Sequence, residues 1–95
     1  MFTVELKARQ NPDFPRRHDL PDKTTAEVAT LHDASVACRR FIEEHALGGG
    51  NWAGGQVRDA ATGKAVARVS YNGRVWTPER RWDDRKEIPL EAVAS

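Results

Sequence analysis

Basic and aromatic side chains are the residues of this chain best suited to chemistry with a partner. Eleven of the fifteen basic residues are arginine, whose planar guanidinium fork suits carboxylate, phosphate and aromatic groups better than lysine does. The stretch from Gln56 to Lys86 holds eight basic residues against four acidic ones, although the net charge of the whole chain is only +1. We therefore expect a local binding surface rather than a strong overall field for nucleic acid.

Arginine and tryptophan are typical of the residues that anchor protein interfaces. The acidic residues between the arginines of segment 79–87 oppose phosphate binding and favour a protein or nucleoprotein partner with mixed charges. The pattern predicts a partner-binding site with a main patch of Arg74, Arg80, Arg81 and Trp82 and a second patch of Phe14, Arg16 and Arg17. The alternative is a nucleic-acid-binding module, with affinity that falls steeply as salt rises, built from Arg58, Arg68 and Arg74.

Residues suited to catalysis or metal binding are scattered along the chain. Zinc needs three or four ligands at fixed spacing, whereas the single cysteine and the three histidines are Cys38, His18, His32 and His45. Cys38 and His45 are separated by about 10 Å along a helix, which is too far for a nucleophile and its base. Nearly every acidic residue has a basic residue close by in sequence. We therefore expect no enzyme activity, no metal and no cofactor.

Glycines cluster in the run GGGNWAGG at residues 48–55. A phosphate-binding P-loop has Lys and then Ser or Thr after its glycines, and this run has neither. A dinucleotide-binding fingerprint precedes a helix, whereas this run follows a predicted helix and precedes a predicted strand. The run is therefore predicted to be a structural connection, in which Trp52, its one large side chain, packs onto the core.

The elements that position these residues follow from apolar periodicity. Residues 2–9 alternate without interruption, which predicts a half-buried strand, and residues 24–30 favour a short edge strand over an early helix start. Residues 31–46 predict one helix, with Thr30 and Asp33 at capping-box spacing and Gly48 as the left-handed residue that ends it. Its apolar stripe is Leu31, Ala34, Cys38, Phe41, Ile42 and His45.

Two hairpins are predicted after the glycine run, the second of them at Asn72-Gly73. This dipeptide is the strongest signal for a two-residue type I′ turn, which would place Ser70 opposite Val75. Strand parity then puts on the core side Val57, Ala67, Val69 and Trp76. The far face would hold Arg58, Val66, Arg68, Ser70, Val75 and Thr77.

These elements predict a small α+β domain over residues 1–77. One helix packs on an antiparallel sheet of three to four strands, in the order β-α-β-β-β or with an additional strand before the helix. Residues 10–23 form a proline-rich loop, and residues 78–95 form a charged C-terminal arm. The single cysteine and the lack of an apolar run of membrane length indicate a cytoplasmic protein. An open sheet edge also allows a homodimer.

The middle third of the chain resembles a group of short, uncharacterised proteobacterial proteins, many of which are carried by phages, plasmids and other mobile elements. The shared run comprises FIE at 41–43, GGG at 48–50, GGQV at 54–57, TGK at 62–64, VARVS at 66–70 and YNGRVW at 71–76. Small accessory proteins of this kind include anti-CRISPR inhibitors. The resemblance therefore implies a non-enzymatic accessory or inhibitory factor that blocks a protein or nucleoprotein surface.

Overall fold

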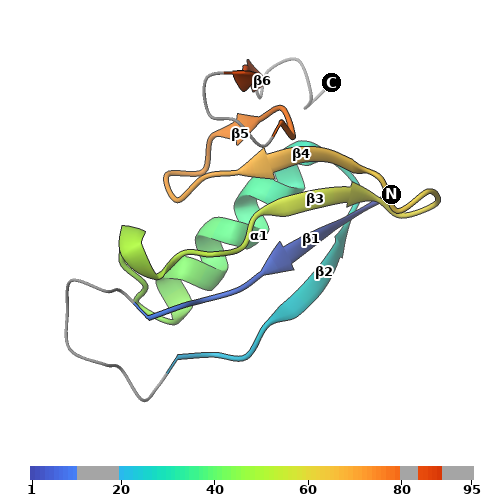
Figure 1. The fold of residues 1–95 in the computed structure, drawn as a ribbon. Helices are drawn as coiled ribbons and strands as arrows, with labels where there is room; N and C mark the ends of the chain where they lie inside the picture. Colours follow the sequence, from blue (N-terminus) through green and yellow to red (C-terminus); the bar gives the residue numbers. More distant parts are fainter. Residues whose placement is uncertain (11–19, 80–83, 89–95) are drawn as a thin grey trace.

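The computed structural model of the protein describes residues 1–10, 20–79 and 84–88. The elements, in chain order, are β1 (Phe2–Leu6), β2 (Thr24–Val28), α1 (Leu31–Glu44), the 3-10 helix η1 (Gly49–Asn51), β3 (Gln56–Asp59), β4 (Ala65–Val69), β5 (Val75–Trp76) and β6 (Glu87–Ile88). The strands form one antiparallel sheet in the order β2-β1-β3-β4-β5-β6, and α1 crosses one of its faces (Figure 1).

The α+β class and the single helix on an antiparallel sheet are confirmed, but the sheet has six strands rather than three to four. The edge strand expected before the helix does form, as β2. The segment after Thr77 then returns to the sheet as β6, within the residues predicted to be a C-terminal arm. Thr77 N–H donates to Lys86 C=O at 2.8 Å and Val75 pairs with Ile88, so this return is fixed by backbone pairing and by half-buried Ile88.

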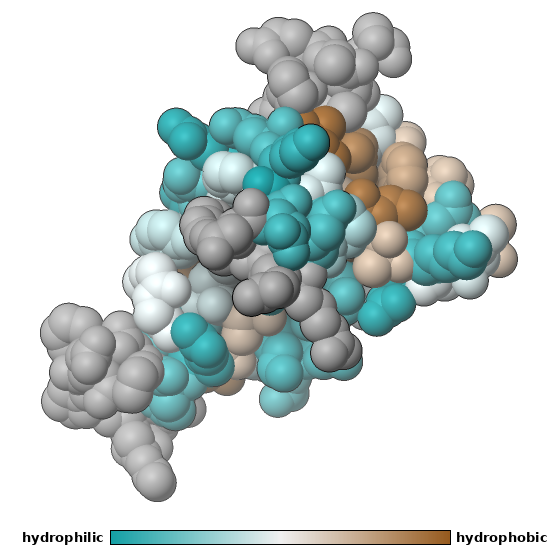
Figure 2. Space-filling model, turned by 45° about the horizontal axis from the view of Figure 1, so that its top comes forward, coloured by the Kyte–Doolittle hydropathy of each residue, from teal (hydrophilic) through white to brown (hydrophobic). Residues whose placement is uncertain are grey.

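The core lies between α1 and the sheet face that it covers. Val4, Val57, Val69, Val75 and Cys38 are the largest side chains with less than 2% of their surface exposed. The predicted helix stripe is buried at Ala34, Cys38, Phe41 and Ile42, whereas Leu31 and His45 are only half-buried. In the view of Figure 2, hydrophobic residues reach the surface mainly in one patch and hydrophilic residues cover much of the rest.

The helix begins as predicted and ends two residues earlier than predicted. Thr30 Oγ1 accepts a hydrogen bond from Asp33 N–H at 3.0 Å, as an N-cap does. The prediction that Gly48 is the left-handed residue is wrong, because Ala46 takes that conformation with φ 50° and Gly48 has φ −85°. Leu47 N–H donates to Ile42 C=O at 2.9 Å, which closes the last turn and buries the Leu47 side chain.

The glycine run is a structural connection, as predicted. Trp52 is 8% exposed, and its indole Nε1–H donates to Val69 C=O at 3.2 Å, so the buried ring has its polar atom paired. Asn51 attaches the run to Arg9, three residues beyond the end of β1. Its side-chain Nδ2 donates to Arg9 C=O, and its backbone carbonyl accepts from Arg9 N–H. Beyond them, Gly55 N–H donates to Glu5 C=O at 2.7 Å.

The second hairpin turn has three residues, not two. Val69 pairs with Val75 and Arg68 with Trp76, while Ser70 N–H donates to Arg74 C=O across the turn. A type I′ turn needs positive φ at both central residues, but here only Gly73 has it, at φ 87°. The extra residue shifts the register by one, so Val75 is buried in place of Trp76. The predicted placement of Trp76 in the core and Val75 outside is therefore wrong.

Candidate partner-binding surface

The sheet face turned away from α1, here called the outer face, carries the exposed arginines of the sheet. Val57, Val69 and Val75 point to the helix, so their neighbours along each strand point the other way. This alternation places four large side chains of adjacent strands on the same face, and we call this face the Arg/Trp surface. Its members are Arg58 on β3, Arg68 on β4, and Arg74 and Trp76 at β5.

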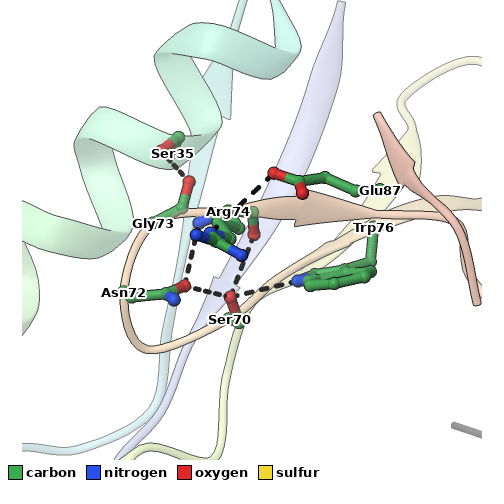
Figure 3. A network of polar contacts seen from close by, with 7 residues as sticks. All are labelled: Ser35, Ser70, Asn72, Gly73, Arg74, Trp76 and Glu87. Atoms are coloured by element: carbon green, nitrogen blue, oxygen red, sulfur yellow. Dashed lines mark hydrogen bonds and ion pairs between the residues drawn. The ribbon is translucent and has the colours of Figure 1, made fainter. Parts of the chain in front are cut away.

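A polar network holds the β4–β5 hairpin at one end of this surface. Ser70 Oγ–H donates to Asn72 Oδ1 at 2.6 Å and accepts from Trp76 Nε1–H at 3.2 Å. Asn72 Oδ1 also accepts from Arg74 N–H at 3.2 Å. Figure 3 shows these side chains drawn together beside the turn, with Glu87 reaching toward Arg74 from β6. The network fixes the orientation of the indole.

Two helix side chains clamp the same hairpin from the core side. Ser35 Oγ–H donates to Gly73 C=O at 2.6 Å, and Arg39 Nη1–H donates to Tyr71 C=O at 2.6 Å (Ser35 and Gly73 in Figure 3). The Arg39 guanidinium also lies 5.4 Å from the Tyr71 ring centre, and the Tyr71 hydroxyl donates to Leu47 C=O. Both ends of the turn are therefore attached to α1 and to the loop that follows it.

A solvent-open hollow of about 390 Å³ lies on the hairpin side of the Arg/Trp surface. Its wall is formed by Ser70, Tyr71, Asn72, Arg74 and Trp76. Arg74 Nε is 3.9 Å from Glu87 Oε2, and the two side chains are 58% and 46% exposed. Such an ion pair contributes little because water screens it, so Glu87 holds Arg74 only weakly.

The charge of the outer face changes along the sheet. Its β3–β5 part carries the three arginines, whereas its β1–β2 part carries Glu5 and Glu27. Lys23 Nζ pairs with Glu5 Oε2 at 3.4 Å above a smaller hollow of about 200 Å³. Arg58 is already engaged, because its Nη1–H donates to Gly63 C=O and its Nη2–H to Gln56 Oε1. The face is thus mixed in charge rather than uniformly basic.

The structure places on one sheet face the three arginines predicted for the nucleic-acid alternative, but Arg58 lies opposite Ala65 at the start of β4 and Arg74 lies opposite Ser70 beyond its end, with Arg68 between them. Of the predicted partner-binding residues, Arg74 lies in this group, and the others lie outside the described residues: Arg80, Arg81, Trp82, Phe14, Arg16 and Arg17.

Sequence reasoning missed Ser35, Arg39 and Trp76 as parts of this arrangement. Arg39 Nη2 pairs with the Glu43 carboxylate one turn along α1 at 3.5 Å, and its other terminal nitrogen, Nη1, holds the hairpin. The sequence does contain a sign of this contact: Ser35 and Arg39 are one helical turn apart and border the apolar stripe, so both can reach the segment that packs beside the helix.

The buried cysteine and the titratable residues offer no second site among the described residues. Burial raises the pKa of the Cys38 thiol to about 12, so it carries almost no thiolate at neutral pH. No three His, Cys, Asp or Glu side chains within residues 1–10, 20–79 and 84–88 lie close enough to hold a metal ion.

The comparisons with known proteins gave no match: no family model, no curated sequence and no solved structure is significantly similar to the chain. The resemblance to small proteins of mobile elements therefore stays a prediction. In the described part of the chain, no helix is both long enough and apolar enough to cross a membrane.

Proposed function

We propose that the protein is a non-enzymatic binding protein that holds an acidic segment of a protein or nucleoprotein partner on its Arg/Trp surface. The observation that carries the proposal is the open hollow lined by Arg74 and Trp76, on a sheet face that also carries Arg58 and Arg68. In keeping with the resemblance of the middle third, the protein would act as an accessory or inhibitory factor that blocks the surface it binds.

The chemistry of the surface favours carboxylate groups. A guanidinium group binds a carboxylate through two parallel N–H···O bonds, and Arg74 presents such a group beside the hollow with only a weak ion pair to release. The hollow also exposes part of an indole and a phenol ring, the side-chain types that most often anchor protein interfaces.

The rigidity of the hairpin supports the same proposal. Ser70 and Asn72 hold the Trp76 side of the turn, and Ser35 holds Gly73 from the helix. A surface that is ordered before binding loses less conformational entropy when the partner arrives. A binding role therefore needs no rearrangement of the hairpin backbone, and Arg74 has only to release Glu87.

Nucleic acid is the second candidate, since three arginines share one face of an antiparallel sheet. Two features weigh against it. Glu5 and Glu27 on the β1–β2 part of the same face would repel an extended phosphate backbone more than a short acidic segment at the hairpin, and Arg58 has both terminal nitrogens engaged. Mixed charge of this kind suits a partner with both acidic and other polar groups.

The experiment is a pair of NMR titrations of labelled protein, one with a hexaglutamate peptide and one with hexathymidylate. Hexaglutamate should shift the Trp76 indole N–H and the amides of the residues that line the hollow, namely Ser70, Tyr71, Asn72, Arg74 and Trp76. The double variant Arg58→Glu/Arg74→Glu should weaken this binding by at least about tenfold. The control Arg40→Glu, exposed on α1 across the sheet, should leave it unchanged.

Each other outcome decides against the acidic-segment proposal. Tighter binding of hexathymidylate at the same resonances, with a steep salt dependence, would assign the surface to nucleic acid. The absence of shifts from both probes would remove the surface as a binding site. A triple replacement of Arg80, Arg81 and Trp82 in the same titration tests whether the predicted tail patch adds to the affinity.

A further inference from the structure

β2 forms one edge of the sheet, and the direction of its backbone groups can be worked out from its neighbour β1. The carbonyls of Met1, Glu5 and Lys7 accept hydrogen bonds from the β3 side, namely from Ala60, Gly55 and Ala53 N–H. The odd-numbered residues of β1 therefore point their backbone toward β3. Its even-numbered residues point toward β2 and pair with Thr24, Ala26 and Val28.

It follows that Thr25 and Glu27 direct their N–H and C=O groups away from β1, to the open edge of the sheet. No described segment pairs with this side of β2, which is the first strand in the sheet order (Figure 1). The strand keeps an unbroken register with β1 over five residues, without a bulge or a proline. Edges that proteins protect against pairing usually have one of these devices.

We propose that β2 pairs with β2 of a second copy of this chain, antiparallel and about a two-fold axis at Thr25. In this register Lys23 of each copy lies opposite Glu27 of the other, so two opposite-charge pairs form across the new strand pair. The side chains of Lys23, Thr25 and Glu27 are all exposed and, being two residues apart along the strand, lie together on the outer face. The Glu5 carboxylate at 3.4 Å holds the Lys23 ammonium on that face, near the edge.

Charge and backbone chemistry disfavour the neighbouring registers. An axis at Glu27 would set two glutamates opposite each other, and an axis at Thr24 would set Glu27 opposite Pro21, which has no N–H to donate. An axis at Ala26 would set Lys23 opposite Ala29 and Glu27 opposite Thr25, without a direct charge pair. Thr25 is the one centre among these that pairs both charges directly.

The pairing would join two six-stranded sheets into one, with both outer faces on the same side. The dimer would then display two Arg/Trp surfaces, one from each copy, and a partner with two acidic segments could bind both. The dimer itself does not depend on the proposed function, because none of the residues that form it belongs to the Arg/Trp surface.

The first experiment is sedimentation equilibrium of the purified chain over a wide concentration range. The wild type should show a monomer–dimer equilibrium, and Glu27→Lys should weaken the dimer by at least about tenfold because it replaces both attractions with repulsions. The exchange Lys23→Glu/Glu27→Lys should restore the dimer when it is combined with Glu5→Lys, which keeps an opposite charge beside residue 23. Thr25→Pro should abolish it without unfolding the monomer, since this N–H is not used within one copy.

The second experiment is disulfide trapping. Residues facing each other in a hydrogen-bonded antiparallel pair have Cα atoms about 5.5 Å apart, within disulfide range. Thr25→Cys should therefore cross-link to itself under mild oxidation much faster than Thr62→Cys, which is exposed in the distant β3–β4 turn. The native Cys38 is fully buried and does not compete.

A wild-type chain that is monomeric up to about 500 µM would overturn the proposal, since the strand pair and its two charge pairs would then contribute less than about 4–5 kcal/mol to association. A dimer that Thr25→Pro and Glu27→Lys leave intact would also overturn it, because the contact would then lie elsewhere. Equal cross-linking of the two cysteine variants would exclude the register at Thr25.

Discussion

Adding one methyl group at Gly54 should disrupt the junction between β1 and the glycine run. A Cβ built on Gly54 would lie 2.5 Å from Glu5 C=O oxygen and 2.6 Å from Lys7 N, and both are backbone atoms of β1 or its extension. It would also lie 3.1 Å from the Trp52 ring. No side-chain rotation relieves contacts with backbone, so the two segments must separate by about 0.5–1 Å.

The cost can be set against the whole stability of the domain. Overpacking of this kind costs about 1–3 kcal/mol and more where the backbone must shift, so we expect about 3 kcal/mol for Gly54→Ala. The total free energy of unfolding for a chain of this length is about 5–14 kcal/mol. With a urea m-value of about 1.5 kcal/mol/M, the denaturation midpoint should fall by about 2 M.

Gly49→Ala is the matched control within the same glycine run. The nearest atom to its added Cβ is Tyr71 Cδ1 at 3.8 Å, an ordinary contact, and Gly49 does not have positive φ. Its free energy of unfolding should therefore stay within about 0.5 kcal/mol of the wild type, which is about 0.3 M in the urea midpoint. Urea unfolding followed by tryptophan fluorescence measures both variants. Equal midpoints for the two would refute the close backbone approach on which the structural role of this run rests.

Two further predictions concern the core and the side of the sheet to which Val75 points. Burial raises the pKa of the Cys38 thiol to about 12, so a thiol reagent at pH 8 should react with Cys38 only when the chain unfolds, for example in urea. Rapid reaction of the folded chain in buffer without urea would contradict the burial of Cys38. Val75→Ala should cost about 2 kcal/mol, because two buried methyl groups and their packing are lost, whereas the exposed neighbour Arg74 can be replaced by Ala within about 0.5 kcal/mol. Thermal unfolding of the two variants measures both losses of stability. A larger loss for Arg74→Ala than for Val75→Ala would indicate the two-residue turn.

The helix and the inner strands could be predicted because the spacing of their apolar residues shows which side of each element is buried. Val4 and Leu6 alternate with polar neighbours, and Ala34, Cys38, Phe41 and Ile42 recur at helical spacing. Hydrophobic burial depends on this periodicity alone, so each pattern indicates both the element and its inner face. The burial of Trp52 could be predicted as well, because it is the one large apolar side chain in the glycine run and only its ring can attach that run to the core.

The end of the helix and the β6 strand could not be predicted, because each depends on contacts far away in the chain. Ala46 has left-handed φ, which costs an alanine about 1 kcal/mol, so that the next residue, Leu47, can reach the core. A local pattern favours the glycine at 48 instead. β6 has only two residues, and its place beside β5 follows from Thr77 bonding to Lys86. Two residues are too few for periodicity to indicate a strand.

The place of Arg74 and Trp76 on the outer face follows from a competition between two turns. Asn72-Gly73 can form a two-residue turn or end a three-residue one, and the choice exchanges which of Val75 and Trp76 is buried. Burying Trp76 would take an indole N–H into the core, where it needs an acceptor, whereas Val75 has no polar atom to satisfy. In the observed register Ser70 Oγ accepts that N–H near the surface and Ser35 fixes Gly73 to the helix. The Arg/Trp surface is therefore a consequence of how the core is packed.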